Sequence, residues 1–127
     1  MKPKIILQCI GHFRELGYNY EAAPSIVDAR GKRTTTNKDK VVQYLRAGKA
    51  YLISPGVTKD CFQPSAFIGS RTTRTDGTYT WPDVLAYYVE RYDIALSEHF
   101  ERFMETRDWQ VPDDIDLLSL ELPARPY

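Results

Sequence analysis

The pattern of apolar and polar residues separates stretches with helical spacing from stretches that alternate. Apolar residues recur every three or four positions over residues 4–17, so they would share one helical face. Gly17 follows and suits the left-handed conformation that commonly ends a helix. We therefore predict an N-terminal helix over residues 4–17. Its apolar face would be Ile6, Cys9, Ile10, Phe13 and Leu16.

The next segment gives weaker signals. Residues 25–29 fit either a short strand or a linker whose Ile26 and Val27 reach the core. Residues 30–40 are polar and basic, and we read the first half as an exposed loop. Thr36 and Asp39 have the spacing of a capping box. A short amphipathic helix should follow and end at Gly48.

Strand-forming residues dominate the middle of the chain. Residues 49–54, KAYLIS, are rich in strand formers and stop at Pro55-Gly56, and a long polar connection is expected to about Pro64. A second strand is predicted from Ala66 through residue 74. Asp76-Gly77 is a strong hairpin signal, because a type I′ turn needs positive φ at both central residues. Residues 78–81 would return as the second hairpin strand.

At Trp81 the apolar period changes from two to 3.6, which predicts a helix beginning at Pro82. A second helix is expected from Glu98 to about Arg107, with Ser97 as its cap. Both helices need an apolar surface to cover, and the strands supply one. The predicted fold class is α+β. A small antiparallel sheet, with its hairpin around Asp76-Gly77, would pack against the N-terminal helix, the middle helix and the C-terminal helix pair.

A chain of 127 residues fits a single domain. We place that domain at residues 1–110 and treat residues 111–127 as an acidic, proline-containing tail. The tail could add an edge strand, wrap the body or dock on a partner. Its prolines argue against a long helix.

The formal net charge of zero hides an asymmetry. Residues 1–81 carry 13 Lys/Arg and 6 Asp/Glu (+7), whereas residues 82–127 carry 4 and 11 (−7). The two charged faces could be solvated or paired, or one could serve a charged partner. No apolar run approaches the roughly 20 residues of a membrane span. We expect a cytoplasmic protein with no membrane contact.

Known catalytic and metal-binding motifs are absent from the sequence. Cys9 and Cys61 are far apart and are expected to be free thiols. His12 and His99 have no oriented partner in sequence, and we read both as ordinary helix-surface residues. We therefore predict no catalytic residues, no metal and no cofactor.

Residues 75–89, TDGTYTWPDVLAYYV, resemble the core of small, mostly uncharacterised bacterial proteins. These share a T-D-G-x-aromatic-x-W-x-x-x-L-x-Y-Y-V pattern, with an upstream Y-L-x-x-G that here is Tyr44 to Gly48. The chain departs from the pattern at Ser97, where proline is common. The similarity covers about Lys40 to Met104. Some proteins of this kind resemble the immunity partners of bacterial toxins, which implies an inhibitor of a cognate toxin.

The functional prediction is a non-enzymatic protein-binding module, an immunity-type inhibitor that covers a basic toxin site. Its oligomeric state is left open. The acidic residues share one helix face or follow it, and Tyr87 would be an exposed aromatic anchor. The predicted partner-binding residues are Glu98, Glu101, Glu105, Asp108 and Tyr87.

Two alternatives remain open. One is a small enzyme or ligand-binding domain with a pocket between the hairpin and the helices. Its candidate residues are Arg71, Arg74, Tyr79 and His99. The other is RNA binding through the basic 30–40 loop, although nucleic-acid binders usually carry excess positive charge and a recognisable reading element.

Overall fold

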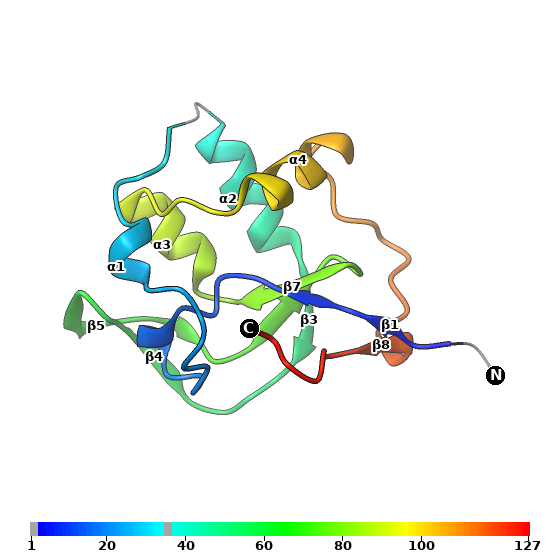
Figure 1. Cartoon of the computed structure of the whole chain (residues 1–127), viewed down its shortest axis with the longest axis horizontal. Helices are drawn as coiled ribbons and strands as arrows, with labels where there is room; N and C mark the ends of the chain where they lie inside the picture. Colours follow the sequence, from blue (N-terminus) through cyan, green and yellow to red (C-terminus); the bar gives the residue numbers. More distant parts are fainter. Residues whose placement is uncertain (1–2, 35–36) are drawn as a thin grey trace.

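Helices gather on one side of a group of short strands (Figure 1). The computed structural model describes residues 3–34 and 37–127, and the predicted α+β class is confirmed. The helices are α1 (Ile26–Ala29), α2 (Lys38–Ala47), α3 (Leu85–Tyr92) and α4 (Glu98–Thr106), with 3-10 turns η1 (Arg14–Leu16) and η2 (Leu117–Ser119). None of the helices in the described ranges is long and apolar enough to cross a membrane.

The central sheet has four strands in the order β2-β7-β6-β3. These are β2 (Gln8–Cys9), β3 (Lys49–Leu52), β6 (Thr73–Thr75) and β7 (Tyr79–Pro82). Strands β3, β6 and β7 are antiparallel, as predicted for the 49–54 strand and the hairpin. Strand β2 adds to the other edge in parallel, with Gln8 opposite Tyr79.

The predicted N-terminal helix is wrong. Residues 5–9 form strands β1 (Ile5–Ile6) and β2, which leave Ile6 64% exposed and bury Leu7 instead. Gly11 continues this non-helical path with a φ of +78°, and it packs so closely on α3 that a Cβ there would lie 2.6 Å from Leu85 Cδ2. Three isoleucines in this segment also favour strands. Tertiary pairing therefore overrides the helical spacing.

The hairpin is confirmed, but its turn is shifted by one residue. Asp76 N–H donates to Tyr79 O, so Gly77 (φ +93°) and Thr78 are the central residues. Asp76 is buried, and its Oδ1 accepts the N–H groups of Thr78 and Tyr79 at 2.9 and 2.7 Å. Its Oδ2 accepts the hydroxyl of Tyr44 at 2.5 Å. Asp76 thus closes the turn and ties it to α2.

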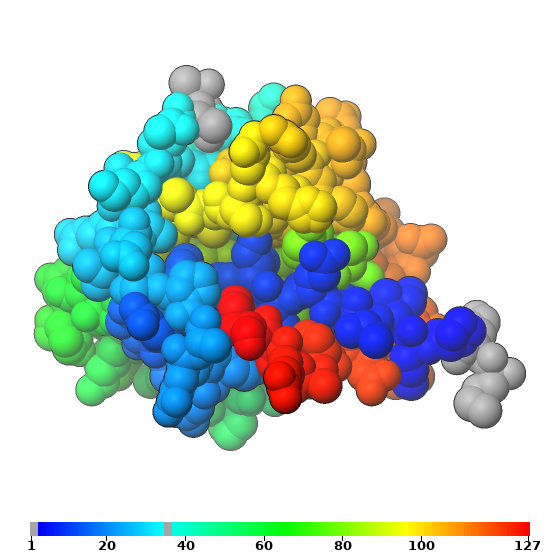
Figure 2. All heavy atoms as spheres, in the orientation of Figure 1, coloured from blue at the N-terminus to red at the C-terminus, as the bar shows by residue number. Residues whose placement is uncertain are grey.

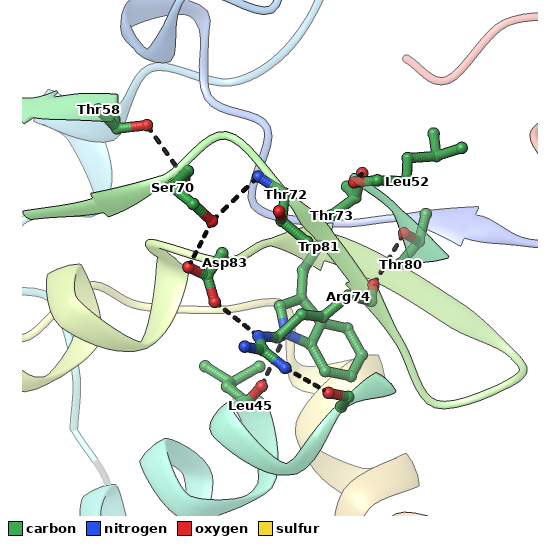
Figure 3. A network of polar contacts seen from close by, with 11 residues as sticks. Leu45, Leu52, Thr58, Ser70, Thr72, Thr73, Arg74, Thr80, Trp81 and Asp83 are labelled. Atoms are coloured by element: carbon green, nitrogen blue, oxygen red, sulfur yellow. Dashed lines mark hydrogen bonds and ion pairs between the residues drawn. The ribbon is translucent and has the colours of Figure 1, made fainter. Parts of the chain in front are cut away.

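Trp81 lies at the centre of the core and is fully buried. Its indole Nε1 donates to Leu45 O at 3.1 Å, which satisfies a carbonyl in the last turn of α2 (Figure 3). Its ring lies close to those of Tyr44 and Phe100, from α2 and α4. Gly48 lets α2 approach, because a Cβ there would lie 2.6 Å from the Trp81 ring. The predicted end of this helix at Gly48 is confirmed.

A polar network joins the hairpin to the start of α3 (Figure 3). Arg74 Nε donates to Asp83 Oδ1 at 2.6 Å, and Arg74 Nη1 donates to Gly48 O at 2.7 Å. Ser70 Oγ donates to the other oxygen of Asp83 at 3.0 Å. Helix α3 therefore begins at Leu85, not at Pro82 as predicted, and Asp83 binds Arg74 instead of entering the first helical turn.

Other local predictions have mixed outcomes. Residues 25–29, expected to be a strand or linker, form the single-turn helix α1, capped by Ser25 Oγ. The predicted capping box rests on Thr36, which lies outside the described residues; the N-cap of α2 is Asn37. Helix α4 is confirmed, with Ser97 Oγ accepting the N–H of Phe100 at 3.2 Å.

A second hairpin replaces the predicted long polar connection. Strand β4 (Val57–Asp60) pairs antiparallel with β5 (Gln63–Ser70). The fully buried carboxylate of Asp60 holds this hairpin on α3, because it accepts the hydroxyls of Tyr92 at 2.5 Å and Tyr87 at 2.7 Å. Burial alone would raise the pKa of Asp60, but these hydrogen bonds hold it below its usual value.

The C-terminal tail packs along the body. Strand β8 (Leu120–Glu121) pairs in parallel with β1, and Leu7 N–H donates to Glu121 O at 2.8 Å. The tail ends at Tyr127, whose Oη accepts the backbone N–H of His12 at 2.9 Å and lies 3.2 Å from His12 Nδ1. Because the Tyr127 oxygen accepts the hydrogen bond from this N–H, the Tyr127 hydroxyl can donate a hydrogen bond to His12 Nδ1. His12 is buried and lies outside any helix, so its predicted place on a helix surface is wrong, and burial lowers its pKa to about 4.

Replacing Gly48 with alanine should lower the free energy of unfolding by about 1–3 kcal/mol, because the new methyl group overlaps the Trp81 ring. Urea unfolding followed by tryptophan fluorescence measures the change. Gln43→Ala, at an exposed position of the same helix, should change stability by less than about 0.5 kcal/mol. Equal stability of the Gly48→Ala variant and the wild type would contradict this packing.

His12 should make the fold acid-sensitive. The pKa of His12 is 6.5 in the unfolded chain and about 4 in the folded protein, so folding favours the neutral imidazole. This stabilisation is present above pH 6.5 and is lost as the pH falls toward 4, by about 3 kcal/mol. Urea unfolding across this range and NMR titration of the His12 ring test it. A His12 midpoint near 6.5 would contradict the prediction.

Candidate functional site: an acidic edge

The predicted acidic face of α4 divides into paired and unpaired carboxylates. Glu98 forms an exposed ion pair with Arg102, one helical turn away. Glu101 pairs with Arg33, whose side chain is only 2% exposed. Arg33 also donates to Ile94 O and Asn37 Oδ1, both at 3.3 Å. Glu101 therefore neutralises a buried guanidinium and has a structural role.

The other two predicted residues of this face are free of ion pairs. Glu105 and Asp108 are exposed, and neither forms an ion pair within the described ranges. Helix α4 ends here because Asp108 (φ 53°) and Trp109 (φ 58°) adopt left-handed backbone conformations. Trp109 N–H returns to Met104 O at 2.9 Å. The chain then leaves the helix and runs down one side of the molecule (Figure 1).

The segment after α4 adds more carboxylates to the same side. Asp113, Asp114 and Asp116 are exposed, and no ion pair joins them to other described residues. Lys49 Nζ approaches this segment, but it donates to the backbone carbonyl of Asp113 and not to a carboxylate. We call this set the acidic edge. It consists of Glu105, Asp108, Asp113, Asp114 and Asp116.

Exposed apolar side chains border the acidic edge. The parallel β1–β8 pair brings Ile5 and Ile6, which are 50% and 64% exposed, beside the end of the tail. Leu118 in η2 is 86% exposed, and Lys4 Nζ donates to its carbonyl at 2.6 Å. Figure 2 shows the blue N-terminal atoms beside the orange and red atoms of this segment. Apolar groups next to unpaired charge are typical of protein interfaces.

A shallow groove of about 370 Å³ connects the two parts of this surface. It is lined by Ile5 and Leu120 from the strand pair, by Gly77 of the hairpin turn and by Asp114 and Ile115 of the tail. Gly77 packs near Ile115, since a Cβ on the glycine would lie 3.6 Å from Ile115 Cγ1. The groove therefore has a mixed lining: Ile5, Ile115 and Leu120 are apolar, Asp114 and Asp116 are exposed carboxylates, and Arg107 is a cation within the lining.

Tyr87 does not belong to this surface. Its ring is half-buried on α3, and its hydroxyl donates to Asp60. Burial, together with that hydrogen bond, raises the pKa of Tyr87 to about 12. The Tyr87 hydroxyl therefore has a structural role, and partner binding by its half-exposed ring stays a prediction. The position of Tyr87 outside the apolar stripe of its helix could not reveal the buried Asp60 carboxylate that accepts its hydroxyl.

The basic 30–40 segment is largely engaged within the molecule. The Arg30 guanidinium lies over the rings of Phe62 and Tyr92, at 4.3 and 4.7 Å. Arg33 is buried beside Glu101, and Lys38 pairs with Asp93 at 2.8 Å. Cations that already have internal partners make a poor platform for phosphates, so this arrangement offers little support for RNA binding.

The residues proposed for a pocket separate into two groups. Tyr79 and His99 line one cleft of about 500 Å³ between β2, α1 and the beginning of α4. Arg74 is bound to Asp83 and Gly48, and Arg71 lies over Tyr18 and reaches Gly17 O at 3.4 Å. Neither arginine lines that cleft. Within the described ranges, no three His, Cys, Asp or Glu side chains converge as a metal site would require.

Comparison of the chain with protein-family models, curated proteins and solved structures gives no match. The resemblance of residues 75–89 to an immunity-protein core therefore stays a prediction. In the structure these residues form the hairpin turn, strand β7 and the start of α3, with Trp81, Leu85, Tyr88 and Val89 buried. They are residues of the turn and the core, not of the acidic edge.

Glu101 and Glu98 should differ in their effect on stability although both are helix glutamates. Glu101→Ala leaves the buried Arg33 charge unpaired, and we expect a loss of about 3 kcal/mol in the free energy of unfolding. Glu98→Ala removes only an exposed pair and should cost less than about 1 kcal/mol. Urea unfolding of both variants tests this. Similar losses would contradict the division into structural and surface carboxylates.

Proposed function

We propose that this protein is a protein-binding module whose acidic edge docks on a basic surface of its partner. The observation that carries the proposal is the acidic edge itself: five exposed carboxylates without ion-pair partners in the described ranges. Four other carboxylates of the C-terminal third, Asp83, Glu90, Asp93 and Glu101, pair with cations of the N-terminal part. The charge of the edge is thus left for a partner.

The neighbouring apolar residues supply the second part of an interface. Charged groups mainly speed association and select the partner, whereas affinity depends on buried apolar contacts. Ile5, Ile6 and Leu118 are exposed beside the groove and could be covered on binding. Exposed apolar residues beside the acidic edge suit a partner that presents an apolar residue among lysines and arginines.

The more specific form of the proposal is an immunity-type inhibitor of a bacterial toxin domain that acts by occlusion. It rests on the resemblance of residues 75–89 and on the acidic edge. Toxin domains that act on nucleic acids need basic surfaces to hold phosphates. A protein that presents carboxylates in place of those phosphates could cover such a surface without any chemistry of its own.

Reversing charges on the acidic edge should weaken partner binding. The double variant Asp113→Lys/Asp114→Lys should lose about tenfold or more in affinity, because like charges then face each other. The partner would be captured from the native host with tagged wild-type protein and identified by mass spectrometry. Its affinity for both forms would then be measured by calorimetry, and wild-type binding should weaken as salt rises.

The matched control is Glu21→Lys/Asp39→Lys, which makes the same change in net charge at exposed residues on other elements. This variant should bind like the wild type. Loss of binding in both double variants would point to net charge alone. Full binding by the edge variant, or failure to capture any stoichiometric partner, would contradict the proposal.

A further inference from the structure

The β4–β5 hairpin is attached to the rest of the molecule without any strand pairing. Within the described ranges, β4 and β5 pair only with each other, and no backbone-to-backbone hydrogen bond joins them to another element. Figure 1 shows the hairpin at the end of the molecule away from β1 and β8. An isolated two-stranded hairpin is at best marginally stable in water, so side-chain contacts with the body must hold this one in place.

The hairpin contributes little to the apolar core. Phe67 in β5 is 66% exposed, and the two buried residues of β4, Thr58 and Asp60, are both polar. Phe62 in the turn and Ile68 in β5 pack against the core but are only partly buried. No apolar side chain of residues 57–70 is fully buried. Burial of apolar surface therefore supplies only a small part of the free energy that holds the hairpin on the body.

Polar contacts join the turn of the hairpin to α3. One oxygen of the buried Asp60 carboxylate accepts the hydroxyls of Tyr92 at 2.5 Å and Tyr87 at 2.7 Å. The hydroxyl of Tyr88 accepts the N–H of Cys61 at 2.9 Å. These contacts are lost together when the turn moves away from α3, and water can then replace both hydroxyls on Asp60. The net cost of opening is therefore modest, because hydrogen bonds to water take the place of those within the protein.

The base of the hairpin is flexible on one strand and anchored on the other. Residues 53–56, which lead into β4, are all exposed, and Gly56 has a φ of +104°. Strand β5 ends at Ser70, whose Oγ donates to Asp83 at 3.0 Å and accepts the N–H of Thr72 at 3.2 Å (Figure 3). The hairpin can therefore turn about its base without breaking a strand pair of the central sheet.

We propose that the β4–β5 hairpin is a flap that opens about residues 53–56 and Ser70, and that Asp60 is the latch that closes it on α3. Opening uncovers the hydroxyls of Tyr87 and Tyr92, so the flap controls whether this part of α3 is available to a partner. The acidic edge contributes no residue to the flap or to the latch. The flap and the proposed docking function can therefore fail independently.

Native-state hydrogen exchange of the full-length protein, followed by two-dimensional NMR at low urea concentrations, tests the flap. The hydrogen-bonded amides of residues 57–70 should open as one group, about a hundredfold or more often than those of β6 and β7. Their exchange should depend little on urea, because opening of the flap exposes far less surface than unfolding of the chain. Equal opening free energies and equal urea dependence in the hairpin and the central sheet would overturn the proposal.

Two tyrosine variants separate the latch from the core. Tyr92→Phe keeps the ring but removes a hydroxyl from the buried Asp60, so it should speed exchange of the hairpin by about tenfold or more. Tyr44→Phe is the matched control, because its hydroxyl also donates to a buried aspartate, Asp76, at 2.5 Å.

The control contact lies in the core and stays intact when the flap opens. Tyr44→Phe should therefore speed exchange of β6 and β7, through a loss of global stability, and leave exchange of the hairpin unchanged. Hairpin exchange that is faster in Tyr44→Phe by the same factor as that of β6 and β7 would show that the hairpin opens only on global unfolding, and would overturn the flap. Unchanged hairpin exchange in Tyr92→Phe would overturn the role of Asp60 as the latch.

Discussion

The close approach of Trp81 to Gly48 determines how the helices and the sheet fit together. The buried indole occupies the space that a side chain at Gly48 would need, and its N–H satisfies the last turn of α2. Through ring contacts with Tyr44 and Phe100, it also sets the positions of α2 and α4. The buried Asp76–Tyr44 hydrogen bond fixes the hairpin turn on the same helix. The placement of α4, and so of the segment that follows it, depends on this core.

The charge asymmetry of the chain has a structural explanation. Four ion pairs join a cation of residues 1–81 to an anion of residues 82–127: Arg33–Glu101, Lys38–Asp93, Arg46–Glu90 and Arg74–Asp83. Opposite charges in the two parts of the sequence therefore face each other in the folded structure. The five carboxylates of the acidic edge, and Glu121 in β8, have no such ion pair within the described ranges. These unpaired carboxylates are the reason for assigning the acidic edge to a partner.

Local sequence signals predicted the elements whose pattern matches their tertiary role. The 49–54 strand, the hairpin and helices α2, α3 and α4 are of this kind, because Trp81, Leu85 and Phe100 follow the period of the element and are buried. The N-terminal segment was mispredicted because its strands are stabilised by pairing with β7 and β8, more than 70 residues away. The β4–β5 hairpin was missed because the buried Asp60 that anchors it reads as a polar loop residue.

The candidate site was only partly predictable for the same reason. Helical spacing places Glu98, Glu101 and Glu105 on one face. It could not show that Glu101 forms an ion pair with Arg33, which is far away in sequence. The acidic tail residues were recognised as acidic, whereas their proximity to Ile5 and Ile6 depends on the parallel β1–β8 pair. Among the residues that line the cleft, the sequence indicates Tyr79 and His99 as candidates, whereas Asp28 gives no signal.

The proposed docking surface joins residues 4–9 with residues 105–121. Hydrogen–deuterium exchange of the protein with and without its captured partner tests this claim most directly. Binding should slow exchange in residues 4–9 and 105–121 together, with little change in α1 and in the β4–β5 hairpin. Slower exchange confined to α3 and the β4–β5 hairpin, with residues 105–121 unchanged, would contradict it.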